Sequence, residues 1–440
     1  MTKVSRPKSS APFSLAPGRK TTVAFLAVFV GASFFCRTAL NSLQEPLQAN
    51  LHLSDNQIAL VMGTAMAIPA VLGGVPVGLL VDRFNRARLL AVFCLLNLVG
   101  TLLTALSSNL PMLLVARFII GFSTAAVGIA VISLLADLFP RSQRGRGSMV
   151  YGVSQIVGMA AAFAAGAGVA ALFHSPDMWR PGTLVLSIPL LAVLLLSFLL
   201  REQERKEIAQ VRPTVAKSAR ELWAFRRVSG PLLCGVMAIG VADGTTVVWV
   251  VPTLARNFDL GIGAANGIMS LALVVGGLLG PILGGFAADR CIRSGGAARA
   301  MTLLTVLGAL SGVLGLFALA PGALFASIGL TGFLLAGTMI ISVVLTLVTV
   351  LLPNELRGFC VAVISTGQIV VSFGLAPSLV SIVATAMGSP SSVGAALAIV
   401  CAGASVFCGA AFLCGRTLVK RRPVPANPVA EELPQAEVSS

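Results

Sequence analysis

Charged side chains are scarce in this sequence of 440 residues: Asp, Glu, Lys and Arg together make up 11% of it. A soluble globular domain carries about 25% charged residues, because its surface must face water. Apolar residues account for 56% of the chain, and its mean hydropathy is +0.94. The shortage of charge excludes an ordinary soluble protein and predicts a chain that crosses a membrane many times.

Acidic residues are the scarcer sign, with 16 Asp and Glu against 31 Lys and Arg and a formal net charge of +15. Such a basic excess is the usual electrostatic signature of a nucleic-acid-binding protein. Here, however, 27 of the 31 basic residues fall in the segments that would share one side of the membrane with both termini. Loops rich in Lys and Arg stay in the cytoplasm, so we expect cytoplasmic termini and no nucleic-acid partner.

Residues that carry catalysis or hold metals are also few. The two histidines fall in expected outer loops, away from any Ser or Cys nucleophile, and the eight cysteines show no metal-ligand spacing. We therefore expect no enzymatic activity, no cofactor and no metal site.

The sequence has no Asn-x-Ser/Thr sequon, and the apolar stretch 21–43 is long enough to be a membrane helix rather than a cleavable signal. These features favour a multi-pass protein of a bacterial inner membrane.

Long apolar segments are what the sequence has in abundance. We expect twelve membrane helices, six in an N-terminal bundle over 21–200 and six in a C-terminal bundle over 230–418. The first six are 21–43, 54–81, 88–107, 111–139, 147–173 and 179–200, and the second six are 230–255, 263–288, 299–320, 322–352, 359–387 and 390–418. Residues 1–20 and 419–440 are expected to be disordered cytoplasmic tails.

Local signals mark several boundaries. Ser54 and Gln57 form a capping box at the start of the second helix, and Pro111 suits the first turn of the fourth. Residues 201–229 are rich in charge and predict a cytoplasmic linker between the bundles. Within it, 221–227 is amphipathic with basic ends, which predicts a helix on the membrane surface or, alternatively, a partner-binding helix.

A short motif occurs twice in the chain. A glycine four residues before an Asp-Arg pair stands at Gly78–Arg83 and again at Gly285–Arg290, 207 residues later. Gln155–Val157 recurs as Gln368–Val370 at an offset of 213, and the six extra residues are expected in the loop Cys291–Ala300. A parallel repeat of this kind predicts two halves related by an axis along the membrane normal.

This repeated Gly-x-x-x-Asp-Arg loop resembles the signature loop of the major facilitator superfamily, and the resemblance covers roughly residues 20 to 420. It implies an all-α membrane protein of twelve transmembrane helices in two pseudo-symmetric six-helix bundles. Gly78 would let helices approach closely, and Asp82 and Arg86 could pair with neighbouring helix ends and latch one conformation, with simple topological anchoring as the alternative. The full set of candidate latch residues is Gly78, Asp82, Arg83, Arg86, Asp289 and Arg290.

Several shorter stretches resemble the spinster-like branch, whose members are linked to lysolipid and sphingolipid export. They are Leu53–Asp55, Pro76–Leu79, Ala116–Arg117 with Gly121, and Trp179–Arg180. That branch implies an Asp-Arg pair in the first helix and a Glu seven residues after the Arg of the fourth. Arg37 and Arg117 match, but Cys36 and Thr124 stand where the acids are expected. This departure leaves uniport and exchange open beside proton coupling.

Three charged residues lie clearly inside the apolar segments, away from the segment ends: Arg37, Arg117 and Asp243. A charge at the bilayer centre costs about 2.5–3.5 kcal/mol on insertion scales, so such residues are candidates for function. Two guanidinium groups facing one cavity would bind a carboxylate, phosphate or sulfate, and the alternative is that each caps backbone carbonyls. Asp243 is a candidate proton site opposite the two arginines, with structural pairing as the alternative.

Polar residues at helical spacing complete the candidate site. The expected substrate-binding residues are Arg37, Asn41, Gln44, Arg117, Thr124, Tyr151, Gln155, Thr246 and Gln368, although Ser, Thr and Gln also serve as ordinary contacts between membrane helices. Together they predict a monomeric secondary transporter for a small anionic or amphipathic solute, which works by alternating access. Its partners would be the bilayer, the solute and, if coupled, protons. A membrane sensor that does not transport is the alternative from another class.

Overall fold

The computed structural model describes residues 17–139, 144–173, 175, 177–200, 215–388 and 392–421, and the regular secondary structure of these residues is helical. The predicted tails fall largely outside this range, as do residues 201–214 of the linker 201–229. A helix satisfies each backbone N–H and C=O within its own segment, which a bilayer requires. The predicted all-α class is therefore confirmed.

Helices α1 to α8 form the first bundle. Its six crossings are α1 with η1 and α2, then α3 with η2 and α4, and then α5, α6, α7 and α8 in turn. Their bounds are α1 Pro17–Ala39, η1 Leu40–Leu43, α2 Gln44–Asn50, α3 Asp55–Ala59, η2 Leu60–Thr64, α4 Ala65–Arg83, α5 Arg86–Leu106, α6 Leu110–Leu138, α7 Arg144–Leu172 and α8 Trp179–Ser197. Since η1 is a 3₁₀ turn and η2 a π-helical turn, the first two crossings depart from α-helical geometry along their length.

The second bundle begins after the short helix α9. The bounds are α9 Val215–Ala224, α10 Arg226–Phe258, α11 Ile262–Leu314, η4 Gly315–Leu319, α12 Ala323–Leu351, α13 Asn354–Gln368, η5 Ile369–Leu375, α14 Ala376–Ala386 and α15 Val393–Arg421. Here η5 is a second π-helical turn, and it joins α13 and α14 into one crossing.

One helix of the second bundle is long enough to cross a membrane twice. Together α11 and η4 run over 58 residues, Ile262–Leu319, which is about 87 Å of helix against the roughly 30 Å that a crossing needs. The backbone leaves helical geometry at Gly295 and Gly296, and the φ of 65° at Gly296 favours glycine. The eleven apolar helices of the described chain thus make twelve crossings. The predicted loop Cys291–Ala300 is wrong in extent, because both flanks stay helical up to this glycine pair.

Two predicted helix starts are confirmed, and one predicted helix is not. The Ser54 hydroxyl accepts a hydrogen bond from the Gln57 N–H at 3.3 Å, while the Gln57 side chain accepts one from the Ser54 N–H at 2.9 Å. Pro111 lies in the first turn of α6. The predicted helix 221–227 is wrong in its bounds, because α9 ends at Ala224 and α10 already begins at Arg226.

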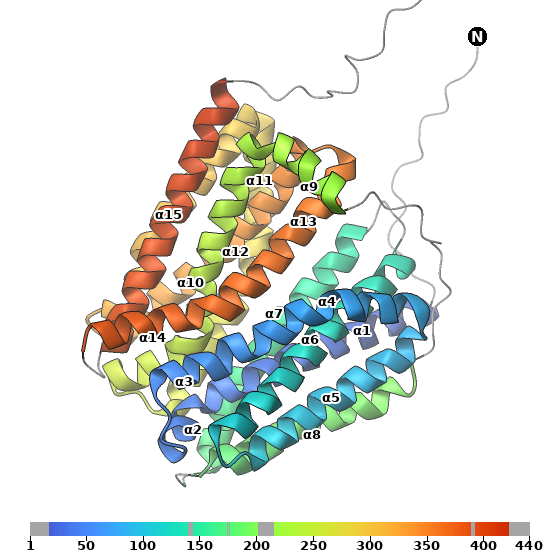
Figure 1. Ribbon diagram of the computed structural model, residues 1–440. Coiled ribbons are helices and arrows are strands. Elements are labelled where there is room, and N and C mark those ends of the chain that lie inside the picture. The colour runs from blue at the N-terminus through green and yellow to red at the C-terminus, as the bar shows by residue number, and fades with distance from the viewer. Residues whose placement is uncertain are drawn as a thin grey trace, which may run out of the picture.

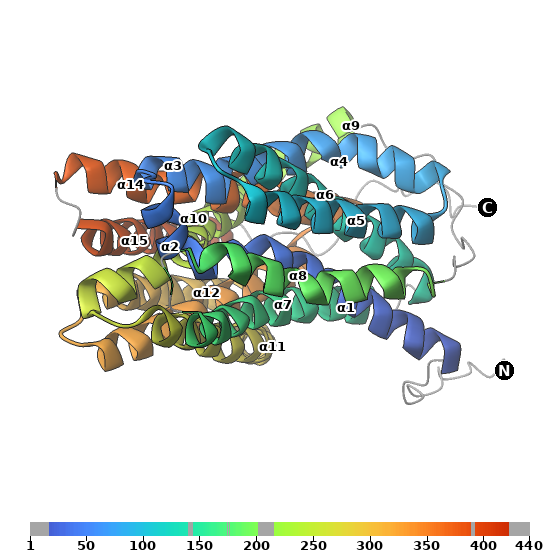
Figure 2. The ribbon, with the colours of Figure 1, turned by 90° about the horizontal axis from the view of Figure 1, so that it is seen from below.

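The two bundles touch at one end and diverge at the other (Figures 1 and 2). In Figure 1 the second bundle rises toward the top and the first bundle runs toward the right. The start of α1, the end of α15 and helix α9 lie at the diverging ends, which we call the terminal face. The opposite end, where α3 packs against α14, we call the far face. Helix α7 packs along α11, and α4 along η5, so these pairs close the space between the bundles toward the far face.

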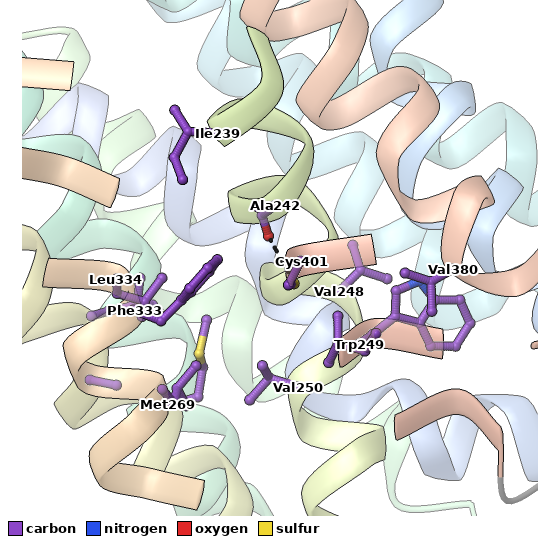
Figure 3. Packing of buried hydrophobic residues seen from close by; sticks show 14 of the residues in the cluster. Ile239, Ala242, Val248, Trp249, Val250, Met269, Phe333, Leu334, Val380 and Cys401 are labelled. Atoms are coloured by element: carbon purple, nitrogen blue, oxygen red, sulfur yellow. Dashed lines mark hydrogen bonds between the residues drawn. The ribbon is translucent and has the colours of Figure 1, made fainter. Parts of the chain in front are cut away.

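Helix α10 is central to the core of the second bundle (Figure 3). Its Trp249 is fully buried and donates its indole N–H to the Pro377 carbonyl at 2.9 Å. On another side of α10, the Cys401 thiol of α15 lies 3.7 Å from the Ala242 carbonyl oxygen. These contacts fix the rotation of α10, and Val247 lies against the first bundle, where its carbonyl accepts a hydrogen bond from Asn41.

Candidate functional site

A small cavity lies where the two bundles meet. The first bundle contributes residues of α1, η1, η2, α4 and α7, and the second contributes residues of α10, η5 and α14. The lining is Phe34, Arg37, Thr38, Asn41, Met62, Met66 and Met159 from the first bundle, and Gly244, Val247, Val248, Ser372, Phe373 and Pro377 from the second. About 20 Å³ is open to the centres of water molecules, which is room for one or two of them.

Arg37 supplies the charge of this cavity. Its guanidinium carbon lies 3.3 Å from the centre of the Phe373 ring in the second bundle and 5.9 Å from the centre of the Phe34 ring on its own helix. Within the described chain this guanidinium forms no hydrogen bond and no ion pair. A cation over an aromatic face gains about 0.5–2 kcal/mol, which does not replace the hydrogen bonds that water would give. The cavity is therefore lined by a cation whose N–H donors are not bonded to any described residue.

Asn41 lies one helical turn beyond Arg37 and lines the same cavity. Its Nδ2 donates to the Val247 carbonyl of the second bundle at 3.2 Å, so this side chain joins the bundles. Its buried Oδ1 has no hydrogen-bond partner in the described chain. The cavity thus offers a solute an acceptor at Asn41 beside the donors of Arg37.

Arg117 is placed differently from Arg37. It is fully buried, and its guanidinium donates to the Arg37 carbonyl at 3.0 Å and to the Val61 carbonyl at 3.4 Å. The Arg37 carbonyl lies near the end of α1, just before the 3₁₀ turn η1, and the Val61 carbonyl lies within the π-helical turn η2. Both are therefore at points where the chain departs from α-helical geometry. Arg117 is therefore engaged by the backbone of its own bundle, in the carbonyl-capping arrangement that the sequence left as the alternative.

Neutral side chains occupy the positions of the two acids that the spinster-like resemblance implied. The Cys36 sulfur lies 2.9 Å from the Thr101 hydroxyl. Thr124 donates to the Asn97 Oδ1 at 3.4 Å, and Ser123 donates to the same oxygen at 2.7 Å. All of these groups are buried. They form a hydrogen-bonded network around Asn97, so Thr124 serves this network and does not line the cavity.

Asp243 does not face the two arginines as the sequence argument expected. Its Oδ1 is buried without a hydrogen-bond partner in the described chain, and it lies 2.8 Å from where a Cβ on Gly337 of α12 would stand. Successive residues of an α-helix point about 100° apart, so the neighbouring Gly244 faces the cavity and Asp243 turns into the second bundle. The carboxyl group forms no ion pair with a described residue.

Two predicted residues of the second bundle also lie outside the cavity lining. The Thr246 hydroxyl donates to the Ala242 carbonyl at 2.7 Å and lies 3.6 Å from the Cys401 sulfur. Gln368 donates to the Val236 carbonyl at 2.9 Å and accepts from the Ser372 hydroxyl at 2.5 Å. These contacts hold α10 to α13, α15 and η5.

Three predicted residues of the first bundle are outside the cavity lining, although one of them, Tyr151, contacts a lining residue. Tyr151 packs edge-on against Phe34, with ring centres 6.4 Å apart. Gln155 is half-buried and makes no hydrogen bond with a described residue. Gln44 is fully buried, and neither its amide nitrogen nor its oxygen has a partner in the described chain. Of the nine predicted residues, only Arg37 and Asn41 line the cavity.

Most of the apolar residues that line the cavity were not among the predicted site residues. Phe34 could have been found, because it stands three residues before Arg37 and shares its helical face. Met62, Met66 and Met159 gave no such signal, since methionine is an ordinary filler of apolar cores. Phe373 is presented by the π-helical turn η5, which no residue pattern marked.

The far face is closed by an ionic cluster between the bundles. Arg256 of α10 lies 2.8 Å from the Glu45 carboxylate and 3.3 Å from that of Asp55, and it donates to the Gln48 side chain at 2.8 Å. All three partners belong to the first bundle. The cluster is about three-quarters buried, with 22–23% of each charged side chain exposed. It therefore seals the cavity from the far face.

The candidate latch residues lie at the terminal face. Arg86 is buried and pairs with Asp137 of α6 at 2.6 Å, which is the kind of helix-end contact that was expected. A Cβ on Gly78 would meet nothing within 4 Å, so the expected close approach at this glycine is absent in this conformation. The other four residues, Asp82, Arg83, Asp289 and Arg290, are exposed.

Comparison with known families agrees with this architecture. The Major Facilitator Superfamily model matches residues 24–368, so the chain belongs to this superfamily. It is 27% identical over 180 residues to Organic anion transporter 3 of Oryctolagus cuniculus, covering 41% of this chain and 31% of that protein. It is 33% identical over 154 residues to Minor myo-inositol transporter IolF of Bacillus subtilis (strain 168), covering 34% and 33%. The chain thus spans about a third of the length of these relatives.

Solved structures extend the likeness over nearly the whole chain. One is a bacterial homolog to the human lysosomal transporter Spinster in an inward-facing and unoccupied conformation, with a TM-score of 0.76, 19% identity, and coverage of 94% of this chain and 100% of that one. Another is a D-xylose-proton symporter, with a TM-score of 0.67, 17% identity, and coverage of 89% and 97%. At these identities the likeness concerns the fold. The predicted resemblance to the superfamily, and in fold to its spinster-like branch, is confirmed.

Proposed function

We propose that this chain is a secondary transporter that moves a small amphipathic organic anion by alternating access. The observation that carries the proposal is the guanidinium of Arg37, which lies in the cavity between the bundles without a hydrogen bond or ion pair to any described residue. Arg37 is partly buried, and a cation withdrawn from water without hydrogen-bond partners is costly until a partner arrives. An acid group on the solute would be that partner, because guanidinium binds carboxylate or phosphate through two parallel hydrogen bonds.

The rest of the lining favours a solute with an apolar body. Apart from Arg37, Thr38, Asn41 and Ser372, the lining side chains are apolar or absent. The Oδ1 of Asn41 would accept a hydrogen bond from a donor on the solute. With about 20 Å³ open to water, the cavity must widen before it admits any organic solute. Widening fits the rocking of two bundles about a central site.

We infer that the terminal face is cytoplasmic, that both termini lie inside, and that the membrane is a bacterial inner membrane. Basic residues gather on this face, as the positive-inside rule requires. The divergence of the bundles at that face and the Arg256 cluster at the far face then correspond to an inward-facing state. The latch role of Asp82 and its repeat counterpart Asp289 belongs to the opposite state, in which the terminal face would close, whereas Arg86 already pairs with Asp137 in this state. A monomer satisfies this scheme.

A spinster-like lipid exporter is the second candidate function, supported by the overall fold and by the apolar lining. Both candidates share an acidic, amphipathic solute. The decisive measurement is an untargeted comparison of metabolites and lipids in cells with and without the transporter, followed by uptake of the changed compound into vesicles with purified protein. We expect a compound with one acid group whose transport is lost in Arg37→Gln. A neutral or cationic compound transported equally well by Arg37→Gln would refute the proposal.

Proton coupling through Asp243 is part of the proposal, because its Oδ1 is buried without a hydrogen-bond partner in the described chain. Asp243→Asn should abolish accumulation driven by a pH gradient while exchange of the anion across the membrane continues. A uniporter or exchanger would keep both activities in this variant. Transport that is independent of pH and unchanged in Asp243→Asn would exclude coupling at this residue.

A further inference from the structure

Arg37 contacts two aromatic rings that belong to different moving parts. Phe34 stands on α1 with Arg37 itself, so any rigid motion of the first bundle carries both. Phe373 stands on η5 of the second bundle, and its ring centre is the nearer one, at 3.3 Å against 5.9 Å. When the bundles rock, the contact with Phe34 is kept and the contact with Phe373 is broken.

The position of Phe373 depends on the π-helical turn η5. A π-helical turn adds a residue to the helical turn and frequently occurs at functional sites. Here the backbone carries Phe373 up to the first bundle: a Cβ on Gly63 would stand 2.8 Å from the Phe373 carbonyl oxygen, and the Thr64 hydroxyl donates to the Gly374 carbonyl at 2.9 Å. Gly63 and Thr64 belong to η2, the other π-helical turn. The two irregular turns therefore meet and set the Phe373 ring over Arg37.

We propose that Phe373 couples solute binding to motion: its ring holds Arg37 while the cavity is empty and gives it up to the acid group of the solute. This inference rests on the proposed function for the nature of the solute. Charge-assisted hydrogen bonds to a guanidinium are stronger than a cation–π contact, so the acid group wins the competition. The empty carrier is held in the present conformation by this contact, and the loaded carrier is not. Exchange of loaded forms should then outpace return of the empty form.

The resting contact can be tested without any solute. Hydrogen exchange measured by mass spectrometry on the full chain in lipid nanodiscs reports opening of the far face through segments 44–59 and 253–262. Loss of a desolvated cation–π contact should shift the conformational equilibrium about 5- to 30-fold. We expect Phe373→Leu and Arg37→Gln each to raise exchange in these segments by such a factor, and the double variant to raise it no further. Unchanged exchange in Phe373→Leu, or additive effects in the double variant, would overturn the proposal.

Two matched variants separate the proposed role from general packing. Phe373→Tyr keeps an aromatic ring and should behave as the wild type. Phe34→Leu removes a ring beside the same cation, but within one bundle, and should leave far-face exchange unchanged. If Phe34→Leu and Phe373→Leu raise far-face exchange equally, Phe373 acts only through general packing and the proposal is wrong. Each variant is compared only as a monodisperse sample with its terminal-face helices still protected.

The release step needs an anion, for which octanoate is a simple amphipathic probe and octanamide its neutral match. Octanoate should raise far-face exchange in the wild type but add nothing in Phe373→Leu, where the contact is already lost. If octanamide raises far-face exchange as much as octanoate does, the acid group is not what releases Arg37 from Phe373. If octanoate raises exchange in Phe373→Leu as much as in the wild type, the proposal is also wrong. The two ways of failing can be told apart. If the wild type transports no anion, the proposed function is wrong. If transport works but hydrogen exchange in Phe373→Leu is the same as in the wild type, only the coupling role of Phe373 is wrong.

Discussion

Arg37 and Arg117 lie in the same bundle, and the Arg117 guanidinium donates to the Arg37 carbonyl, yet their surroundings differ in kind. Arg117 is fully buried and donates to two backbone carbonyls, while Arg37 rests on an aromatic ring of the other bundle without a hydrogen bond in the described chain. Both carry the same insertion cost of about 2.5–3.5 kcal/mol. For Arg117 the cost is offset by hydrogen bonds within one bundle, and these bonds stabilise that bundle. For Arg37 no hydrogen bond to a described residue offsets the cost, so a solute that binds its guanidinium would offset it instead.

Removing Arg117 should have the largest effect on stability. In Arg117→Leu the carbonyls of Arg37 and Val61 lose a charged donor in a buried site, at about 1–3 kcal/mol for each group left unsatisfied. We expect the free energy of unfolding in detergent to fall by about 2–4 kcal/mol, as read from denaturant titration of tryptophan fluorescence. Arg37→Leu is the matched control and should change stability by less than about 1 kcal/mol, because it removes a cation that has no hydrogen bond or ion pair in the described chain. If the two variants lose equal stability, the contrast between the arginines is wrong.

Removing Arg37 should have the largest effect on binding. Arg37→Gln keeps a polar side chain but loses the charge, so the affinity for an acidic solute should fall by about 1.5–3 kcal/mol, or roughly 10- to 150-fold. The measurement is a titration of the transported compound against purified protein. Arg117→Lys, which keeps a charge against the carbonyls, should bind the solute within about threefold of the wild type. Equal weakening in both variants would place both arginines in the binding site.

The sequence predicted the span positions well, because the length of an apolar run and its capping residues are local properties. Ser54 with Gln57, and Pro111, marked helix starts that the structure has. The same reasoning could not fix how a helix is rotated. Asp243 and Gly244 are equally plausible cavity residues until the packing of Trp249 and Cys401 around α10 sets which of them lines the cavity.

Irregular turns and long-range partners explain the other misses. The π-helical turns η2 and η5 change the face that following residues present, and a pattern built on 3.6 residues per turn cannot follow them. Asn97 was overlooked although a lone Asn in an apolar span is a signal for a buried network. Its contacts with Ser123 and Thr124 depend on how α5 packs on α6, which only the fold supplies.

A third cation, Arg256, is paired across the bundles rather than within one. Arg256→Gln removes its bonds to Glu45 and Asp55, so the far face should open more often, by about two- to tenfold for a partly buried ion pair. High salt should mimic this change in the wild type. A suitable readout is the accessibility, to a membrane-impermeant thiol reagent, of a cysteine introduced in place of Val248, which lines the cavity, is 4% exposed and lies outside the ionic cluster. Arg180→Gln is the control, since Arg180 stacks on Trp179 within the first bundle and should leave accessibility unchanged.

The smallest effect is expected at Asp82, which lies at the terminal face and away from the cavity. If the motif latches the state in which that face is closed, Asp82→Asn weakens an exposed contact worth about 0.2–1 kcal/mol and slows turnover by about two- to fivefold. The affinity for the solute should stay unchanged, because the cavity keeps Arg37 and Asn41. Asp259→Asn at the far face is the matched control, since its backbone φ of 52° suits Asn as well as Asp. If Asp82→Asn binds the solute poorly but turns over normally at saturating solute, the latch assignment is wrong and this loop contributes to binding.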